Sequence, residues 1–325
     1  MPRPRLDLIY AGFGNVGRRV AGLLAEIGSR LPFDTATLAV LTRHQGREHG
    51  ATTAEAIAHL CARHSEAARD GRLVVIETTV LDIQAGEPAT SHVRAALEGN
   101  AHVVTANKGP VAFAHAALAN VATEHRRRFL FEGVVMDGIP IFNLVRETLP
   151  GVNVEGFRGV INSTTNHILT CLERGESFDA ALAQMQAEGI AEADPSLDVD
   201  GWDAAAKTAA LMNVLMGARV TPHDVARQGI RAITPGDAAA ALARGERLRL
   251  VASAYRDGGG ATRGRVGIES VPATDPLAML EGQQNALLLR TDVLGDIGIL
   301  QRDGGLTQTA YAIVTDLAAV SRWQP

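Results

Sequence analysis

The sequence contains very little lysine. Of its 31 lysine and arginine residues only two are lysines, Lys108 and Lys207, which leaves 29 arginines. Arginine stays charged at any working pH and exchanges no proton, whereas a lysine amine exchanges one readily when burial or a neighbouring cation lowers its pKa. The two lysines are therefore candidates for proton transfer. The alternative is that two lysines persist by chance on a solvated surface.

The sequence is also poor in cysteine and in charge of one sign. Its two cysteines, Cys61 and Cys171, exclude a disulfide framework and indicate a reducing compartment, so we expect a cytoplasmic protein. A net charge of −5, with acids and bases interspersed, argues against nucleic acid as a partner. No apolar segment approaches the length of a membrane span, so no membrane partner is expected. The short apolar run at 6–11 predicts a first strand rather than a signal peptide.

The first 150 residues alternate between apolar runs and helical patterns. With 325 residues, the chain is long enough for two domains. Alternation of this kind predicts a parallel sheet covered on both faces. The predicted strands are 6–11, 36–43, 73–79, 101–106 and 129–135, and the predicted helices include 16–28 and 111–125.

After residue 150 the pattern changes to that of a mixed α/β domain. A glycine-rich piece at 257–264 separates two strand candidates and predicts a hairpin. The last helix is expected to return to the first domain. The predicted strands are 154–161, 247–256, 263–271 and 286–295, and the predicted helices lie near 166–174, 178–188, 204–217 and 307–320.

A glycine loop, GFGNVG at 12–17, follows the first predicted strand directly. In a G-x-G-x-x-G loop, Gly12 allows a tight turn, Gly14 lets the backbone approach a pyrophosphate, and Gly17 lets the helix pack close to the sheet. Its place after a strand and before a helix predicts dinucleotide binding rather than a plain glycine turn. The cofactor-binding candidates in this loop are Gly12, Gly14, Asn15, Val16 and Gly17.

The end of the second predicted strand favours NADP(H) over NAD(H). An Asp or Glu at this position binds the ribose 2′-hydroxyl of NAD. Here the strand ends at Thr42 and Arg43, with His44 and Arg47 nearby, so cations replace the carboxylate. We expect Arg43 to contact a 2′-phosphate. Exposed loop charges with loose cofactor selectivity are the alternative.

Polar residues stand at the ends of two further predicted strands. Ligands of open α/β sheets bind outside the carboxyl ends of the strands. We therefore expect four residues to face the cofactor crevice: Thr79, Thr105, Asn107 and Lys108.

The second lysine follows an acidic stretch that contains Glu192, Asp194, Asp198, Asp200 and Asp203. Asp203 and Lys207 are four residues apart at the opening of a predicted helix, hence on one face. A simple salt bridge at a helix start is one alternative. A calcium loop is another, but the spacing does not match an EF-hand.

These motifs together resemble those of homoserine dehydrogenases. The resemblance covers nearly the whole chain: GFGNVG at 12–17, VVTANKGP at 103–110, GVINSTTNHILT at 159–170, AEGIAEADPSLDVDGWDAAAK at 187–207 and GGLTQTAYAIVTDL at 304–317. It implies NAD(P)-dependent interconversion of L-homoserine and L-aspartate 4-semialdehyde, a step of threonine and methionine biosynthesis. It also implies a Rossmann-type doubly wound parallel sheet followed by a second mixed α/β domain.

The resemblance also implies roles for individual residues. Lys207 is expected to transfer the proton, Lys108 to polarise the reacting oxygen and Asp203 to orient one amine. Glu192 would bind the substrate's α-ammonium group, supported by Asp198, and the substrate would also contact Thr164 and Ser163. Family members bind a monovalent cation, Na⁺ or K⁺, between the domains, and the matching positions here are Glu132 and Val135.

The expected domains are a dinucleotide-binding domain at 1–135, completed by the helix in 306–325, and a substrate-binding and dimerisation domain at 136–305. The dimer is implied by the resemblance, through the sheet of the second domain. The chain ends soon after the last helix, so a regulatory domain, and feedback control by threonine through it, are not expected.

Three departures from the family pattern keep other functions open. Met136 and Asp137 replace two small residues, Ser163 replaces a glycine, and His167 replaces a tyrosine. An altered pocket would suit a paralogue acting on a related amino-acid alcohol or aldehyde, although His167 could also be a satisfied core histidine. A nucleotide-binding sensor without turnover is the third possibility.

Overall fold

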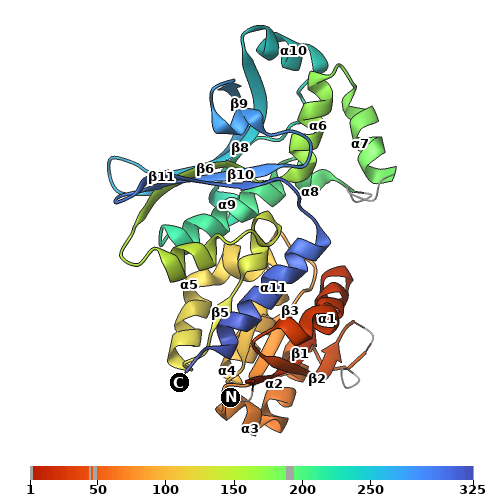
Figure 1. The fold of residues 1–325 in the computed structure, drawn as a ribbon, viewed down its shortest axis with the longest axis vertical. Helices are drawn as coiled ribbons and strands as arrows, with labels where there is room; N and C mark the ends of the chain where they lie inside the picture. Colours follow the sequence, from red (N-terminus) through yellow and green to blue (C-terminus); the bar gives the residue numbers. More distant parts are fainter. Residues whose placement is uncertain (1–2, 44, 47–49, 188–193, 325) are drawn as a thin grey trace. The chain divides into compact units, whose positions relative to one another are not determined.

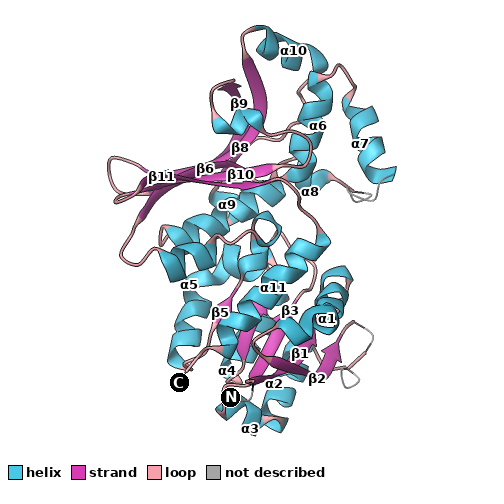
Figure 2. Ribbon diagram, viewed as in Figure 1, coloured by secondary structure: helices cyan, strands magenta, loops and turns pink. Residues whose placement is uncertain are grey.

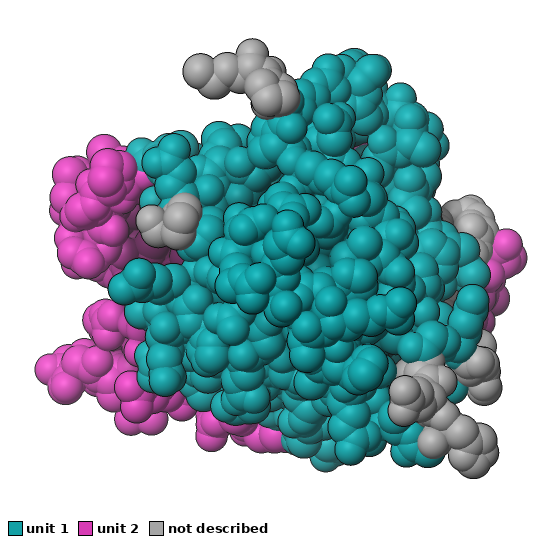
Figure 3. Space-filling view, turned by 90° about the horizontal axis from the view of Figure 1, so that it is seen from below, with its two compact units in different colours: residues 1–148, 305–325 teal, residues 149–304 magenta. Residues whose placement is uncertain are grey.

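The chain divides into two compact units, each described here by itself. The computed structural model describes residues 3–43, 45–46, 50–187 and 194–324. Unit 1 comprises Met1–Thr148 and Gly305–Pro325, and unit 2 comprises Leu149–Gly304 (Figure 3). From the sequence, 136–148 were expected in the second domain, whereas these residues group with unit 1. Hydrogen bonds from the backbone N–H groups of Ile141, Phe142 and Asn143 to the Glu132 carboxylate account for this grouping.

Unit 1 contains the predicted parallel sheet. Its strand order is β2-β1-β3-β4-β5, and every pair is parallel. The apolar run of β3 is buried along its full length, as expected for a strand covered on both faces. The strands are β1 (Arg5–Ala11), β2 (Asp34–Leu41), β3 (Leu73–Glu77), β4 (His102–Thr105) and β5 (Phe129–Leu130).

The predicted fifth strand, 129–135, is wrong beyond Leu130. The chain turns there into two 3₁₀ turns, Glu132–Val134 and Met136–Gly138. Phe131, with φ −155° and ψ 36°, already leaves the strand conformation, and Met136 and Asp137 then adopt positive φ angles of 50° and 45°. The apolar run predicted a strand because periodicity does not distinguish a buried strand from buried turns.

The helices of unit 1 cover its sheet. The last helix, α11, contacts α1, β1 and β4, although it comes from the other end of the chain (Figure 1). Leu8, Tyr10 and Val20 share one core with Ile313 and Leu317 of α11. The helices are α1 (Asn15–Ile27), α2 (Thr53–Arg63), α3 (Ser65–Arg69), α4 (Ala89–Glu98), α5 (Lys108–Glu124) and α11 (Leu306–Ser321), with shorter turns at Gly28–Arg30 and Leu144–Thr148.

Unit 2 is built on a mixed sheet of order β11-β10-β6-β8-β9-β7 (Figure 2). The predicted hairpin is confirmed, because β8 and β9 pair antiparallel around a turn at 257–261. The region predicted as one strand at 286–295 holds β10 and the turn to β11. The strands are β6 (Val154–Val160), β7 (Ala226–Arg227), β8 (Glu246–Arg256), β9 (Thr262–Pro272), β10 (Asn285–Thr291) and β11 (Gly295–Gln301).

Three helices of unit 2, namely α6, α9 and α10, contact β8 in the middle of this sheet, while α7 packs on α6, and α8 packs on α6 and α9. The helices of the unit are α6 (Ser163–Glu173), α7 (Phe178–Ala187), α8 (Ser196–Val199), α9 (Trp202–Leu215) and α10 (Pro235–Ala243), with 3₁₀ turns at Pro222–Asp224 and Pro276–Met279. In the described part of the chain, no helix combines the length and apolarity that crossing a membrane requires.

A buried ion pair joins α6 to β8. The Arg249 side chain is fully buried and lies 2.7 Å from Glu173, measured from Nη1 to Oε1. Arg249 also donates to the carbonyls of Leu248 and Leu280, each at 2.7 Å. Arg247 approaches the second oxygen of Glu173 at 3.0 Å. The Glu173 carboxylate is therefore the anion that compensates a guanidinium removed from water.

We predict that Glu173→Gln lowers the free energy of unfolding by about 3–5 kcal/mol, because it leaves a buried guanidinium without its counter-charge. Urea denaturation measures the change. The matched control is Arg263→Gln in the same unit, which breaks an exposed ion pair with Asp257 and should cost less than about 1 kcal/mol. Equal losses in the two variants would contradict this account of Glu173.

Candidate functional site

The glycine loop lies between β1 and α1, where the strand order of the sheet reverses between β1 and β3. Gly12 has φ +89°, and a Cβ there would lie 2.8 Å from the carbonyl carbon and oxygen of Thr78. A Cβ on Gly17 would lie 3.0 Å from the Gly12 oxygen. Both positions therefore require glycine for conformation or close packing.

Gly14 has a different reason to be glycine. A Cβ at Gly14 would meet no atom within 4 Å, so the space beside it is open. Gly14 is the N-cap of α1, and no side chain caps the N–H groups of the first turn, which begins with Asn15 and Val16. Open space beside uncapped N–H groups fits a phosphate group of a dinucleotide.

The strand that precedes the predicted 2′-phosphate site ends at Leu41. The backbone N–H of Thr42 donates to the Gln45 carbonyl at 2.9 Å. Arg43 follows and is exposed. His44 and Arg47 lie outside the described residues.

A buried carboxylate, Glu77, joins two of the predicted cofactor-binding residues. Glu77 is the last residue of β3 and is fully buried. It accepts hydrogen bonds from the Thr79 backbone N–H at 3.1 Å, from the Thr79 hydroxyl, and from the Thr105 hydroxyl at 3.1 Å. His92 Nδ1 lies 3.5 Å from the same carboxylate. Neither Glu77 nor His92 was predicted from the sequence, although a glutamate at the end of an apolar strand was a signal for Glu77.

Asn107 caps the helix that begins with Lys108. Its side-chain oxygen accepts from the Gly109 N–H at 2.9 Å, and its amide donates to the Thr79 carbonyl at 3.0 Å. Its backbone N–H donates to the Thr105 hydroxyl at 2.9 Å. Lys108 itself is half-buried. The predicted residues Thr79, Thr105, Asn107 and Lys108 are thus brought together at the carboxyl ends of β3 and β4.

The two residues predicted to bind a cation lie in a buried segment of unit 1. The Glu132 carboxylate accepts the N–H groups of Ile141, Phe142 and Asn143 at 2.6, 2.9 and 2.5 Å. Burial raises the pKa of Glu132, and these hydrogen bonds act in the opposite direction. Asp316 of α11 accepts the Glu132 N–H at 2.8 Å, and burial raises the pKa of Asp316 to about 7. The Glu132 carboxylate is thus occupied by three backbone N–H groups. A cation at Glu132 and Val135 would therefore be bound by main-chain oxygens.

In unit 2, Asn162 contacts two predicted residues, Asp198 and Asp203, and Asp203 contacts a third, Lys207. The Asn162 amide donates to Asp198 at 2.6 Å and to Asp203 at 2.9 Å, while its oxygen caps α6 by accepting the Thr165 N–H at 2.9 Å. Lys207 Nζ lies 2.8 Å from Asp203 Oδ2 and donates to the Ile161 carbonyl at 2.8 Å. The Lys207 and Asp203 side chains are only 13% and 14% exposed. Asn162 was not predicted as a residue of this cluster, although it stands at the end of a predicted strand.

Ser163 and His167 lie on α6 beside this cluster. The Ser163 hydroxyl accepts from the Asn285 amide at 2.8 Å, and the same amide donates to Gln301 at 3.1 Å. Neither Asn285 nor Gln301 was singled out from the sequence. Thr164 is 8% exposed. His167 is half-buried, and its buried Nε2 atom has no hydrogen-bond partner among the described residues.

Two parts of the predicted site are not joined by these contacts. Glu192 lies outside the described residues. Lys108 belongs to unit 1 and Lys207 to unit 2. Across the described ranges, no group of three or more His, Cys, Asp or Glu side chains could hold a metal ion.

The fold and the two clusters define a class of enzyme. Unit 1 has a parallel sheet, a glycine loop at the point where strand order reverses, and polar residues at the adjoining strand ends, as dinucleotide-binding domains do. Unit 2 has a mixed sheet and holds a lysine amine against a carboxylate. This combination is typical of NAD(P)-dependent oxidoreductases.

Comparison with known proteins gives the family. The NAD-binding domain model of homoserine dehydrogenases matches residues 12–132, and the homoserine dehydrogenase model matches residues 140–318. An NAD(+)-dependent homoserine dehydrogenase of Pseudomonas canavaninivorans is 34% identical over 95% of this chain and 94% of its own length. The homoserine dehydrogenase of Methanocaldococcus jannaschii is 33% identical over 96% and 97%.

A solved structure agrees with these matches. The crystal structure of a homoserine dehydrogenase from Thiobacillus denitrificans superposes with a TM-score of 0.82 at 29% identity, covering 98% of this chain and 74% of the other. The chain belongs to the homoserine dehydrogenase family. It is an NAD(P)-dependent enzyme of amino-acid biosynthesis that interconverts homoserine and aspartate semialdehyde, which confirms the resemblance found in the sequence.

We predict that Asn162→Asp destabilises the protein more at pH 8 than at pH 5. The variant places a third carboxylate against Asp198 and Asp203, and like charges favour the protonated forms. The folded variant therefore binds protons more tightly than the unfolded chain, so its stability falls as pH rises. The expected loss at pH 8 is roughly 1–3 kcal/mol relative to the wild type, measured by urea denaturation.

Asn162→Ser is the control, because serine caps a helix without adding charge. Its loss relative to the wild type should be the same at both pH values. A pH-independent loss in Asn162→Asp would show that the carboxylates are not close to residue 162.

Proposed function

We propose that Lys207 is the proton-transfer group of the homoserine dehydrogenase reaction and that Lys108 polarises the reacting oxygen. One observation carries this proposal: the Lys207 ammonium is held between the Asp203 carboxylate and the Ile161 carbonyl, 2.8 Å from each, in a largely buried position. Two acceptors fix the direction of the amine, which proton transfer requires. Asp203 is the group that orients it.

The chemistry balances with these residues. The nicotinamide, when bound, supplies or accepts the hydride at the substrate carbon. In reduction, the Lys207 ammonium donates a proton to the aldehyde oxygen, which becomes the hydroxyl of homoserine. In oxidation, the neutral Lys207 amine accepts the hydroxyl proton. Lys108 donates a hydrogen bond to the same oxygen and stabilises the negative charge that develops on it.

For the substrate we propose recognition by acids and by the start of α6. Glu192 and Asp198 provide negative charge for the α-ammonium group of the amino acid, and Asn162 holds the Asp198 carboxylate in place. Thr164 contacts the substrate from the first turn of α6. Because the Ser163 hydroxyl accepts from Asn285, Ser163 contributes its backbone rather than its side chain.

For the cofactor we propose the glycine loop, Gly12, Gly14, Asn15, Val16 and Gly17, together with Thr79, Asn107 and Lys108. Thr105 is fully buried and bonds to Glu77, so it supports the site instead of touching the cofactor. We propose a preference for NADP(H), based on the cation Arg43 and on the lack of a carboxylate at the end of β2, where Thr42 and Arg43 follow Leu41. The P. canavaninivorans relative is named NAD(+)-dependent, which makes the preference a point to measure.

The remaining proposals concern the cation and the cellular setting. We propose that a monovalent cation, Na⁺ or K⁺, binds main-chain oxygens of Glu132 and Val135. The step would lie on the route to threonine and methionine in the cytoplasm. The absence of a disulfide between the two cysteines is compatible with that compartment.

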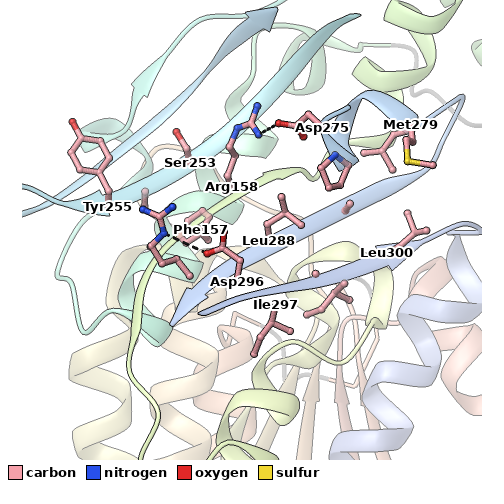
Figure 4. Close-up of a pocket in the computed structure, with 18 of the residues that line it drawn as sticks. Phe157, Arg158, Ser253, Tyr255, Asp275, Met279, Leu288, Asp296, Ile297 and Leu300 are labelled. Atoms are coloured by element: carbon pink, nitrogen blue, oxygen red, sulfur yellow. Dashed lines mark hydrogen bonds and ion pairs between the residues drawn. The ribbon is translucent and has the colours of Figure 1, made fainter. Parts of the chain in front are cut away.

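We also propose a homodimer through the outer face of the unit 2 sheet. This face has a broad hollow of about 1360 Å³ lined by β6, β8, β10 and β11 (Figure 4). Met279, Tyr255 and Leu300 line it and are 74%, 57% and 56% exposed. Arg158, which pairs with Asp275 and Glu269, adds a polar patch. An apolar face of this kind suits an isologous contact between two copies.

Replacing the proton-transfer lysine should abolish most activity. Lys207→Met is expected to lower kcat for aspartate semialdehyde reduction by about 10²- to 10⁴-fold, because the amine that donates the proton is lost. Lys207→Arg keeps the charge but exchanges no proton, so it should be nearly as inactive. The assay follows nicotinamide absorbance. Near-normal turnover in either variant would rule out Lys207 as the proton donor.

Cofactor preference should depend on Arg43. Arg43→Ala is expected to lower the ratio of kcat/KM for NADPH to that for NADH by about 10- to 100-fold, since it removes a charged hydrogen bond to the 2′-phosphate. Arg30→Ala, an exposed cation of the same unit, is the control and should leave the ratio unchanged. A strong NADH preference that Arg43→Ala does not alter would end the NADP(H) proposal.

The oligomeric state tests the outer face of the sheet. Sedimentation should give the wild type about twice the chain mass of 34.3 kDa. Leu300→Arg should shift it to one chain mass, because a buried unpaired charge opposes association. Leu242→Arg, on α10 of the same unit, is 40% exposed before substitution and should leave the dimer intact. A monomeric wild type would contradict the proposal.

A further inference from the structure

We infer that Glu77 is a positioning residue for Lys108: its buried carboxylate fixes the two loops that set the first turn of α5. This inference rests on the role proposed for Lys108. Glu77 touches neither substrate nor cofactor in this account, and it acts through Thr79, Thr105 and Asn107.

The Glu77 carboxylate is buried and lies among hydrogen-bond donors. Its side chain is fully buried at the end of β3, where an ionised carboxylate is costly unless donors surround it. The donors are the Thr79 backbone N–H and hydroxyl, the Thr105 hydroxyl, and His92 Nδ1 at 3.5 Å. They come from three different segments, namely the loop after β3, the end of β4, and α4. The carboxylate thus ties these three segments together at one point.

The hydrogen bonds that begin at Glu77 lead to Asn107. Thr105, which donates to Glu77, accepts the Asn107 backbone N–H at 2.9 Å. Thr79, which also donates to Glu77, offers its carbonyl to the Asn107 amide at 3.0 Å, and the Val80 carbonyl accepts from the same amide at 3.3 Å. Both branches from Glu77 therefore end on Asn107.

Asn107 connects this hydrogen-bond network to the first turn of α5. Its side-chain oxygen accepts the Gly109 N–H at 2.9 Å, so the residues on both sides of Lys108 are held by one side chain. The chain also has little freedom to shift, because a Cβ on Gly109 would lie 2.9 Å from the Cα of Gly86. The backbone of Lys108 is thus fixed by contacts that lead back to Glu77.

The chemistry of the contacts predicts which substitutions keep this order. In Glu77→Gln the amide oxygen can keep accepting from Thr79, while the amide nitrogen faces Thr105. The Thr105 hydroxyl can then accept from that nitrogen and donate to the Glu77 backbone carbonyl, which already lies 3.0 Å away. Glu77→Gln therefore keeps the hydrogen bonds to Thr79 and Thr105 without the negative charge. Glu77→Met keeps only the approximate size of the side chain and loses these hydrogen bonds.

The experiment is a double-mutant cycle between Glu77 and Lys108 in the full-length protein. We measure kcat and the KM for homoserine in Glu77→Met, Glu77→Gln, Lys108→Met and the double variant Glu77→Met/Lys108→Met. Glu77→Met should lower kcat by about 10- to 100-fold, as expected for a displaced catalytic group, and should change the KM for homoserine less than about twofold. Glu77→Gln should stay within about threefold of the wild type.

The double variant separates positioning from a purely structural role. If Glu77 acts through Lys108, adding Glu77→Met to Lys108→Met should lower kcat by less than about twofold further. Glu124→Met, exposed at the far end of α5, is the control and should match the wild type in both backgrounds. Thr105→Val, which removes the hydroxyl between Glu77 and Asn107, should show the same non-additivity and serves if Glu77→Met fails to fold.

The outcomes are distinguishable. Equal fold losses from Glu77→Met in the two backgrounds, or full kcat in Glu77→Met, overturn the inference while leaving the role of Lys108 intact. An equally poor Glu77→Gln also overturns it, since charge rather than hydrogen bonding would then be required. Wild-type kcat in Lys108→Met overturns the proposed role of Lys108, and the inference falls with it.

Discussion

The ion pair between Lys207 and Asp203 is the interaction on which the functional account depends. Both side chains come from α9, one helical turn apart, and both are largely buried. A helical turn sets their separation, and the Ile161 carbonyl gives the ammonium a second acceptor from the end of β6. Asn162 then links Asp203 to Asp198 of α8. One strand end and two helices are thereby held around a single amine.

The two units use the same device to place their lysines. In each unit, an asparagine that is 4% exposed follows a strand and caps the next helix. In unit 1, Asn107 follows β4 and caps α5. In unit 2, Asn162 follows β6 and caps α6. Asparagine suits this position because its oxygen accepts a helix N–H while its amide remains available as a donor. In unit 1 the spare donor binds backbone carbonyls, and in unit 2 it binds two carboxylates. Lys108 follows one asparagine directly, and Lys207 contacts the other through Asp203.

The sequence predicted the elements whose signals are local. The glycine loop and the β8–β9 hairpin each follow from a few consecutive residues, and the alternation of the first domain follows from a series of short apolar runs. The structure contains all three. The i, i+4 spacing of Asp203 and Lys207 predicted their contact for the same reason. Glu77 and Asn285 were missed because their roles arise from partners far along the chain, such as Thr105 and Ser163. The helix α10 was also missed, although Thr234 and Asp237 form a capping box that marks its start.

The central claim is that an amine held by Asp203 carries the proton, and the pH dependence of homoserine oxidation in Asp203→Asn tests it most directly. Asparagine keeps the size and one acceptor oxygen but removes the negative charge that favours the protonated amine. Oxidation needs the neutral amine, so the rise of kcat with pH should move toward lower pH in the variant, by about one pH unit or more. A rise at the same pH as in the wild type would contradict the account, because the titrating group would then not be the partner of Asp203.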